Sequence, residues 1–282
     1  MKLITVKAPA RITLTLDIVK KLNNGFHELN TVKQEIDLHD LITLEQSDNL
    51  LINFKDKKNL NGNNTIIKAV VMLKQKYNVQ DNVEINVEKN IPFGSGLAGG
   101  SSDAASVLAA LNKIWKLKLN EEQLILLARE IGKDVPYFIY KKTCFDNENG
   151  ILKKLAPCPR MNLAVVYPKF EVSSQYAYSN LDYSIVGKKI KTNDMIEAIA
   201  KQDIKEIAKH LHNDFEHFIL GQYPEIKRIK EYLIKNGALN ASMTGSGSCV
   251  FGIFKDKKHA EEIGKKIKKD IKNCKVFVTK TV

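Results

Sequence analysis

The sequence predicts a mixed fold of α-helices and half-buried β-strands. Residues 83–88, VEINVE, alternate apolar and polar side chains as a strand does. A glycine-rich loop follows, and apolar residues then recur at the spacing of one helix face: Ala104, Val107, Leu108, Leu111, Ile114 and Trp115. Because the strand alternates instead of being apolar throughout, we expect a sheet that is covered on one face only.

Strand patterns also dominate the chain before this stretch. Residues 3–18 alternate around Ala8-Pro9-Ala10 and predict two short strands, and residues 34–45 and 50–54 add further strand character. Asn24-Gly25 predicts a turn between them. Residues 64–77 predict a helix with Asn64 as its N-cap.

The chain after residue 115 alternates helices with a few strands. Asn120 caps a predicted helix that Gly132 ends, residues 163–167 predict a buried strand, and residues 193–236 predict three helices. A lysine-rich helix and the strand 275–278 complete the chain. The turn-rich residues 147–159 predict a boundary between two domains, residues 1–157 and 158–282.

Composition indicates an ordinary soluble globular protein. Its 282 residues are 44% hydrophobic and 27% charged, without an apolar run long enough to cross a membrane or a signal-peptide core. We therefore expect a cytoplasmic protein without a membrane partner. Four scattered cysteines predict neither zinc nor a disulfide framework.

The net charge of +12 arises from 44 basic and 32 acidic residues. Many of the lysines lie on the polar face of the predicted helix within residues 255–272, as on a solvated surface. We therefore expect no nucleic-acid partner, although nucleic-acid binding stays open as a distant alternative. A positive field would also attract anionic small molecules.

Residues 91–105, IPFGSGLAGGSSDAA, are the strongest functional signal. Glycines allow a ligand to approach the backbone closely, and Ser101, Ser102 or Asp103 could each cap the following helix. The N–H groups and the positive dipole end of a helix start suit an anion, most often phosphate.

Three interpretations of this loop compete. A Walker A loop is excluded, because no Gly-Lys-Ser/Thr follows the glycines. Gly94, Gly96 and Gly99 match the dinucleotide pattern, but the alternating strand and the helical context of Glu121 do not. A structural turn explains the glycines but needs no Gly-Gly-Ser-Ser sequence.

The third interpretation is a resemblance. Residues 92–104 resemble the phosphate loop of the GHMP kinases, the superfamily of galactokinase, homoserine kinase and mevalonate kinase. The resemblance implies an α+β fold with a two-domain GHMP kinase architecture: a ribosomal S5 domain 2-like N-terminal domain and a ferredoxin-like C-terminal domain, with the active site between them. It implies that ATP is bound by the loop residues Pro92, Phe93, Gly94, Ser95, Gly96, Leu97, Ala98, Gly99, Gly100, Ser101 and Ser102.

Two further motifs of the same family are present. Gly132-x-Asp134-Val135-Pro136 resembles the family segment whose aspartate accepts the proton of the acceptor hydroxyl, so the resemblance makes Asp134 the general base. Residues 241–252, ASMTGSGSCVFG, resemble the motif that closes over the phosphates. The resemblance assigns ligand contacts there to Gly245, Ser246 and Gly247.

The form of the phosphate loop is most similar to the branch that phosphorylates the 2-hydroxyl of 4-diphosphocytidyl-2-C-methyl-D-erythritol. In that branch an aromatic residue and a histidine hold the cytosine, and Phe26 and His27 match them. Tyr178 matches an aromatic residue on the other face of the base. From composition alone, all three could equally be packing or surface residues.

The chain departs from the family at the N-terminus, where Arg11 and Thr13 replace a lysine and an asparagine. We assign Arg11 to catalysis and Thr13 to substrate binding on this resemblance. ATP and Mg²⁺ are the expected cofactors, and the sequence predicts neither a metal ligand beyond Ser102 nor the oligomeric state. A kinase with a different acceptor and a catalytically dead nucleotide-binding relative remain alternatives.

Overall fold

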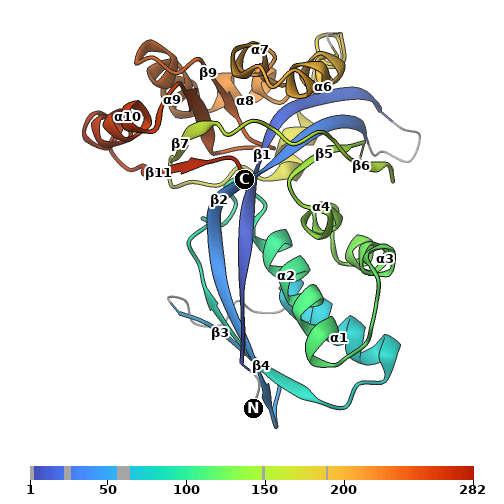
Figure 1. Cartoon of the computed structure of the whole chain (residues 1–282). Helices are drawn as coiled ribbons and strands as arrows, with labels where there is room; N and C mark the ends of the chain where they lie inside the picture. The colour runs from blue at the N-terminus through green and yellow to red at the C-terminus, as the bar shows by residue number, and fades with distance from the viewer. Residues whose placement is uncertain (1–2, 22–26, 56–63, 148–149, 189) are drawn as a thin grey trace. The chain divides into compact units, whose positions relative to one another are not determined.

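The computed structural model describes residues 3–21, 27–55, 64–147, 150–188 and 190–282. The chain forms two compact units, each built from several chain segments (Figure 1). Unit 1 comprises Met1–Ala10, Leu38–Phe93 and Ala98–Lys141; unit 2 comprises Arg11–Asp37, Gly94–Leu97 and Lys142–Val282. The glycine-rich loop therefore contributes to both units. The predicted boundary after residue 157, which divides the chain once along its length, stays a prediction.

Unit 1 contains an open β-sheet with helices packed against it. The strands that contribute to it are β1 (Ile4–Lys21), β2 (His27–Ser47), β3 (Leu51–Phe54) and β4 (Asn82–Glu88), and β1 and β2 continue into unit 2. β4 runs antiparallel to β2 and parallel to β3. Val83, Ile85 and Val87 of β4 are buried and alternate with half-buried polar residues, which confirms the predicted pattern of one covered face.

The predicted break at Pro9 is wrong, because β1 is one continuous strand. The fixed φ of proline is compatible with extended backbone, and its ring removes only one N–H donor from the ladder. Strand pairing therefore continues past it.

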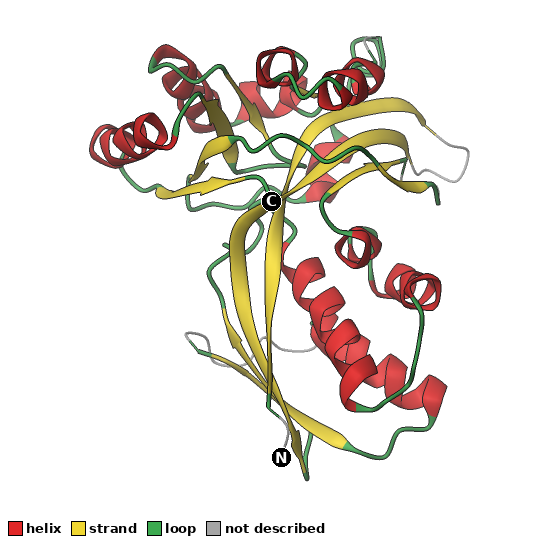
Figure 2. Cartoon of the chain, in the orientation of Figure 1, coloured by secondary structure: helices red, strands yellow, loops and turns green. Residues whose placement is uncertain are grey.

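The helices of unit 1 are α1 (Thr65–Tyr77), α2 (Gly99–Ile114), α3 (Glu121–Ile131) and α4 (Val135–Tyr140). The predicted caps of α1 and α3 are confirmed: the Asn64 side chain accepts the Ile66 N–H (2.8 Å), and Asn120 forms a capping box with Gln123. α1 and α2 pack side by side as the two long helices of this unit (Figure 2).

Unit 2 contains an antiparallel sheet of strand order β11-β7-β10-β9 and a set of covering helices. Its strands are β5 (Thr143–Asp146), β6 (Leu152–Lys154), β7 (Asn162–Tyr167), β8 (His212–Asn213), β9 (Asn240–Met243), β10 (Val250–Phe254) and β11 (Lys275–Lys280). Its helices are α5 (Ser174–Ser179), α6 (Thr192–Ala200), α7 (Ile204–Lys209), α8 (Glu216–Gln222), α9 (Pro224–Lys235) and α10 (Lys257–Asp270).

Helices α9 and α10 contact this sheet, and their apolar faces complete a core that includes Met243 and Phe254. The predicted three helices over residues 193–236 are four in the structure, α6 to α9, and the short strand β8, which pairs with β1, lies between α7 and α8. None of the helices in the described part of the chain has the length and apolarity that a bilayer crossing requires.

Candidate active site

The glycine-rich loop leads into α2, which begins at Gly99. Its N-cap, Ala98, adopts the left-handed conformation (φ 59°), without a capping hydrogen bond from its side chain. The prediction that Ser101, Ser102 or Asp103 caps this helix is wrong, because the helix already begins before them. The Ser102 N–H donates to the Ala98 carbonyl oxygen (3.0 Å). The N–H groups before Ser102 therefore lack partners within the helix and suit an anion.

The start of α2 also leaves space for a ligand. A Cβ at Gly100 would approach only Thr65 Oγ1, at 3.7 Å, whereas one at Gly99 would meet the Ile91 side chain at 2.8 Å. The Ser102 hydroxyl is buried, with no hydrogen-bond partner among the described residues. An unsatisfied hydroxyl beside open N–H groups fits a phosphate group and the magnesium ion that accompanies it.

A cluster of buried charged side chains lies where the chain enters the glycine-rich loop. Lys89 Nζ forms ion pairs with Asp40 and with Asp103 Oδ2, the second at 2.6 Å. Asp40 Oδ1 also accepts the N–H groups of Asn90 (2.6 Å) and Ile91 (2.8 Å). Burial raises the pKa of Asp103 to about 7, and the Lys89 ammonium partly opposes this rise. The cluster therefore ties the entry of the loop to the first turns of α2.

Residues Gly94–Leu97 pack within unit 2, against the third predicted motif. Thr244 Oγ1 donates to the Gly96 carbonyl oxygen (3.2 Å), and the Cys249 N–H donates to the Ser95 carbonyl oxygen (3.0 Å). A Cβ at Gly96 would lie 2.2 Å from the Thr244 carbonyl oxygen. Backbone of two motifs that are distant in the sequence thus meets directly.

Arg11 lies at this contact and is only 6% exposed. Its side-chain Nη1 donates to the Gly96 carbonyl oxygen (2.5 Å) and to Thr244 Oγ1 (3.4 Å). Its backbone N–H donates to the Leu97 carbonyl oxygen (3.1 Å). Thr13 is buried beside it, and its N–H donates to Thr244 Oγ1 (3.1 Å). Both residues contact the third motif, and their roles in catalysis and substrate binding stay predictions.

Asp134 lies in unit 1, between α3 and α4. Gly132 is the C-cap of α3, and Asp134 occupies the N-cap position of α4 without a capping hydrogen bond from its side chain. Arg11 belongs to unit 2, and the catalytic roles predicted for Asp134 and Arg11 stay predictions.

An aromatic cluster in unit 2 contains two of the three residues predicted to hold a base. His27 stacks on Tyr178, with ring centroids 4.9 Å apart and planes 20° apart, and on Tyr183, at 5.8 Å and 5°. His27 Nε2 and the Tyr183 hydroxyl also form a hydrogen bond. Tyr178 in turn packs edge-on against Phe215, at 5.0 Å. The third predicted residue, Phe26, lies outside the described residues.

This cluster is linked to the third motif through α5. Ser174 begins α5, and its Oγ lies 3.0 Å from Ser246 Oγ. Tyr178 lies one helical turn later on the same helix. The short helix α5 therefore contacts both the predicted cytosine site and the third motif.

Sequence reasoning missed Tyr183 and the Lys89 cluster. Lys89 precedes the loop and Asp103 follows it, so a salt bridge across the loop had a local signal. Asp40 and Tyr183 had none, because their partners are distant in the sequence.

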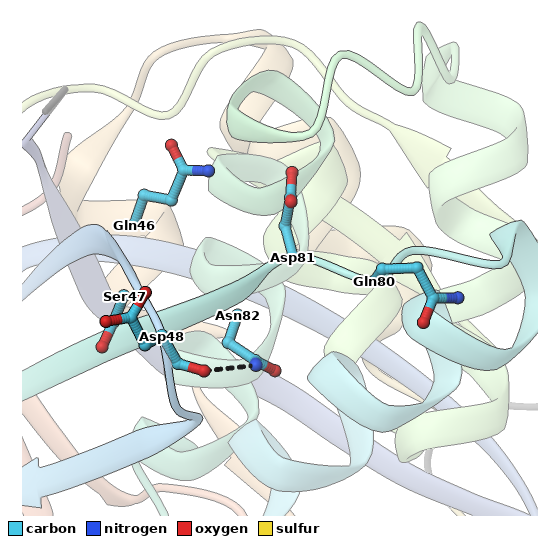
Figure 3. Close-up of a pocket in the computed structure, with 6 residues that line it drawn as sticks. All are labelled: Gln46, Ser47, Asp48, Gln80, Asp81 and Asn82. Carbon is cyan, nitrogen blue, oxygen red and sulfur yellow. Dashed lines mark hydrogen bonds between the residues drawn. The ribbon is translucent and has the colours of Figure 1, made fainter.

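An open pocket of about 400 Å³ lies elsewhere in unit 1 (Figure 3). Polar residues line it: Gln46, Ser47, Asp48, Gln80, Asp81 and Asn82. Asn82 Nδ2 donates to the Asp48 carbonyl oxygen (2.8 Å) across it. No predicted site residue belongs to this lining, so we assign no ligand to the pocket.

Two family models match the chain. The model described as GHMP kinases N terminal domain matches residues 64–142, and the one described as GHMP kinases C terminal matches residues 195–273. The predicted α+β GHMP kinase fold is therefore confirmed.

Relatives and solved structures narrow the similarity. A protein of Caldicellulosiruptor bescii named 4-diphosphocytidyl-2-C-methyl-D-erythritol kinase is 40% identical over 278 residues, which cover 97% of each chain. One of the same name from Clostridium botulinum (strain Alaska E43 / Type E3) is 38% identical, covering 98% of this chain and 99% of its own. The crystal structure of a 4-(cytidine 5'-diphospho)-2C-methyl-D-erythritol kinase matches with a TM-score of 0.85 and 26% identity, covering 99% of this chain and 100% of its own. These matches show that the chain belongs to the GHMP kinases and, within them, to the 4-diphosphocytidyl-2-C-methyl-D-erythritol kinases.

Proposed function

We propose that this chain transfers the γ-phosphoryl group of ATP to the 2-hydroxyl of 4-diphosphocytidyl-2-C-methyl-D-erythritol, a step of non-mevalonate isoprenoid biosynthesis. The observation that carries the proposal is the open start of α2, whose first N–H groups suit nucleotide phosphates. The stacked pair of His27 and Tyr178 supports the cytidine part, because aromatic faces bind bases. Near full-length relatives bear the name of this kinase.

We assign separate residues to ATP, to the acceptor and to the transfer step. Gly94 to Ser102 hold the ATP phosphates, and Gly245 to Gly247 close over them. Phe26, His27 and Tyr178 hold the cytosine, and Thr13 contacts the alcohol. Asp134 accepts the hydroxyl proton as the acceptor oxygen bonds to the γ-phosphorus, and ADP leaves. Arg11 supplies permanent positive charge for the transferred group.

Magnesium is proposed as part of MgATP. When bound, it would neutralise charge that develops on the phosphate oxygens. Ser102 is the one candidate ligand that we name, since its buried hydroxyl lacks a partner among the described residues. No cluster of three or more His, Cys, Asp and Glu side chains in that part of the chain could hold a metal ion. We therefore expect the phosphates and water to supply most of the ligands.

The test incubates the purified chain with MgATP and a panel of acceptors that includes the diphosphocytidyl alcohol and mevalonate. We expect ADP release only with the diphosphocytidyl alcohol. Transfer to another acceptor would favour a kinase with a shifted substrate, and ATP binding without any transfer would favour a dead relative. Cytoplasmic location and the lack of nucleic-acid and membrane partners stay predictions.

Asp134→Asn tests the proposed base, because it keeps the shape of the side chain and removes the proton acceptor. We expect turnover to fall by about 10²–10⁴-fold, the usual effect of general-base removal, while both substrates still bind. Turnover close to that of the unmodified chain would return Asp134 to the role of a turn residue.

A further inference from the structure

Asn213, at the end of β8, lies outside every predicted motif and is 2% exposed. Its Nδ2 donates to the carbonyl oxygens of Met243 and Gly245, both at 2.8 Å. Its Oδ1 accepts the N–H of Phe215 at 3.1 Å. The amide therefore uses both donor hydrogens and its acceptor, and two of these three bonds hold the third motif.

The next turn of the same segment supports this arrangement. Glu216 Oε1 accepts the Met243 N–H (2.7 Å) and the Ser242 hydroxyl (3.1 Å), and its Oε2 pairs with Lys230. Met243 is the last residue of β9, so these bonds lie where the strand becomes the glycine-rich motif.

The two carbonyl bonds fix the direction of two peptide groups. A trans peptide is planar, with its N–H opposite its C=O, so each bond also sets the direction of the following N–H. The Thr244 N–H accordingly donates to the Cys249 carbonyl oxygen (3.0 Å). By the same reasoning, the Gly245 bond turns the Ser246 N–H away from Asn213.

We propose that Asn213 is a positioning residue for the nucleotide: it orients the peptide groups of Met243 and Gly245, and so aims the Ser246 N–H at the ATP phosphates. This rests on the proposed function, in which Gly245 to Gly247 close over those phosphates. Gly245 (φ +57°) and Gly247 (φ +90°) are both left-handed, so this backbone depends on outside support for one orientation.

Asn213→Asp tests this role with almost no change of shape. A carboxylate oxygen replaces Nδ2 and faces two carbonyl oxygens, so both bonds are lost and repulsion replaces them. Asn240→Asp is the matched control, since Asn240 lies on β9 and donates from Nδ2 to the Ala208 carbonyl oxygen (2.8 Å). It loses a similar bond in the same unit, while its one bond to the motif, in which Oδ1 accepts the Ala241 N–H (2.8 Å), is kept by a carboxylate.

The measurements are the dissociation constant of a non-hydrolysable ATP analogue, the kinetic constants for both substrates and the melting temperature, all on the full chain. We expect Asn213→Asp to weaken analogue binding at least about tenfold, or roughly 1.4 kcal/mol, and to leave KM for the alcohol nearly unchanged. Asn240→Asp should change neither constant. Equal effects of the two variants on analogue binding, or an equal loss of both ligands in Asn213→Asp, would overturn the proposal.

Asn213→Ser covers the case in which the aspartate variant does not fold. The smaller side chain keeps a hydroxyl donor without a charge, and we expect analogue binding between that of the unmodified chain and a complete loss. Unchanged binding in this variant would also overturn the proposal. Because the analogue is titrated directly, an unmodified chain that binds it but phosphorylates no acceptor would refute the proposed function alone.

Discussion

Gly96→Ala would test whether the contact between the phosphate loop and the third motif requires glycine. The added Cβ would lie 2.2 Å from the Thr244 carbonyl oxygen and 2.9 Å from the Gly247 carbonyl oxygen. Both atoms belong to the backbone, so no rotamer change relieves the overlap. The φ of +75° adds a second cost, because a residue with a Cβ is strained in the left-handed region.

The size of the effect follows from these two costs. Left-handed backbone costs an L-residue roughly 1–2 kcal/mol, and overfilling a packed site typically costs about 1–3 kcal/mol. We therefore expect the free energy of unfolding to fall by roughly 2–5 kcal/mol. Relief of the overlap must also move Gly96 away from Arg11 and Thr244, so ATP binding should weaken.

Urea unfolding and ATP titration of the same preparation measure both effects. Gly100→Ala is the control, because its Cβ approaches only Thr65 Oγ1 at 3.7 Å and alanine favours a helix over glycine by about 1 kcal/mol. Its free energy of unfolding should not fall. An unfolding midpoint of Gly96→Ala equal to that of the unmodified chain would refute the close approach of the two motifs.

Three further substitutions have defined outcomes. Asp103→Asn should remove a pH dependence: the folded-state pKa of about 7 exceeds the ordinary 3.8, so the folded chain holds a proton that the unfolded chain releases. As the pH rises from about 4 to 7, the free energy of unfolding of the unmodified chain should therefore fall, by at most roughly 1.4 kcal/mol per pH unit. Urea unfolding measures this at each pH, and an equal pH dependence in Asp103→Asn would contradict the reasoning. Tyr183→Phe keeps the ring stack but removes the hydroxyl that hydrogen-bonds to His27 Nε2, so the Kd of the cytidine substrate should rise roughly two- to tenfold while ATP binding is constant. A calorimetric titration in which both affinities fall would indicate a general loss of structure. Tyr178→Ala removes a stacking face worth about 1–3 kcal/mol, so the Kd of the cytidine substrate should rise. An unchanged Kd would mean that Tyr178 only packs against Phe215.

Features that depend on neighbouring residues could be predicted from the sequence. Asn64 and Asn120 cap their helices as expected, since a cap and its N–H partner lie within three residues. The alternation in β4 gave the covered face for the same reason. The sequence predicts too late a start for α2 because Ser101 to Asp103 resemble caps, whereas the helix begins at Gly99 without a capping side chain.

Features that depend on distant residues could not be predicted. Asp40 and Lys89 pair between β2 and the start of the loop, and Asn213 reaches Gly245 across unit 2. Polar residues such as these have the same composition signal on a solvated surface as in a buried network, and only the tertiary fold distinguishes the two cases. The family motifs located the loop, but not the side chains that support it.

Arg11 is the residue that bears most directly on whether this chain is an active kinase. The alternative of a dead relative depends on arginine replacing the lysine of the family pattern. Within unit 2, however, Nη1 of Arg11 donates to the Gly96 carbonyl oxygen and to Thr244 Oγ1, where the loop meets the third motif. Both bonds come from one guanidinium nitrogen, whose two N–H groups point in fixed directions within a rigid plane, so it suits a bridge between two fixed acceptors better than a freely rotating ammonium. Arginine therefore has a structural reason at this position while it keeps the positive charge, and the substitution by itself does not indicate lost activity.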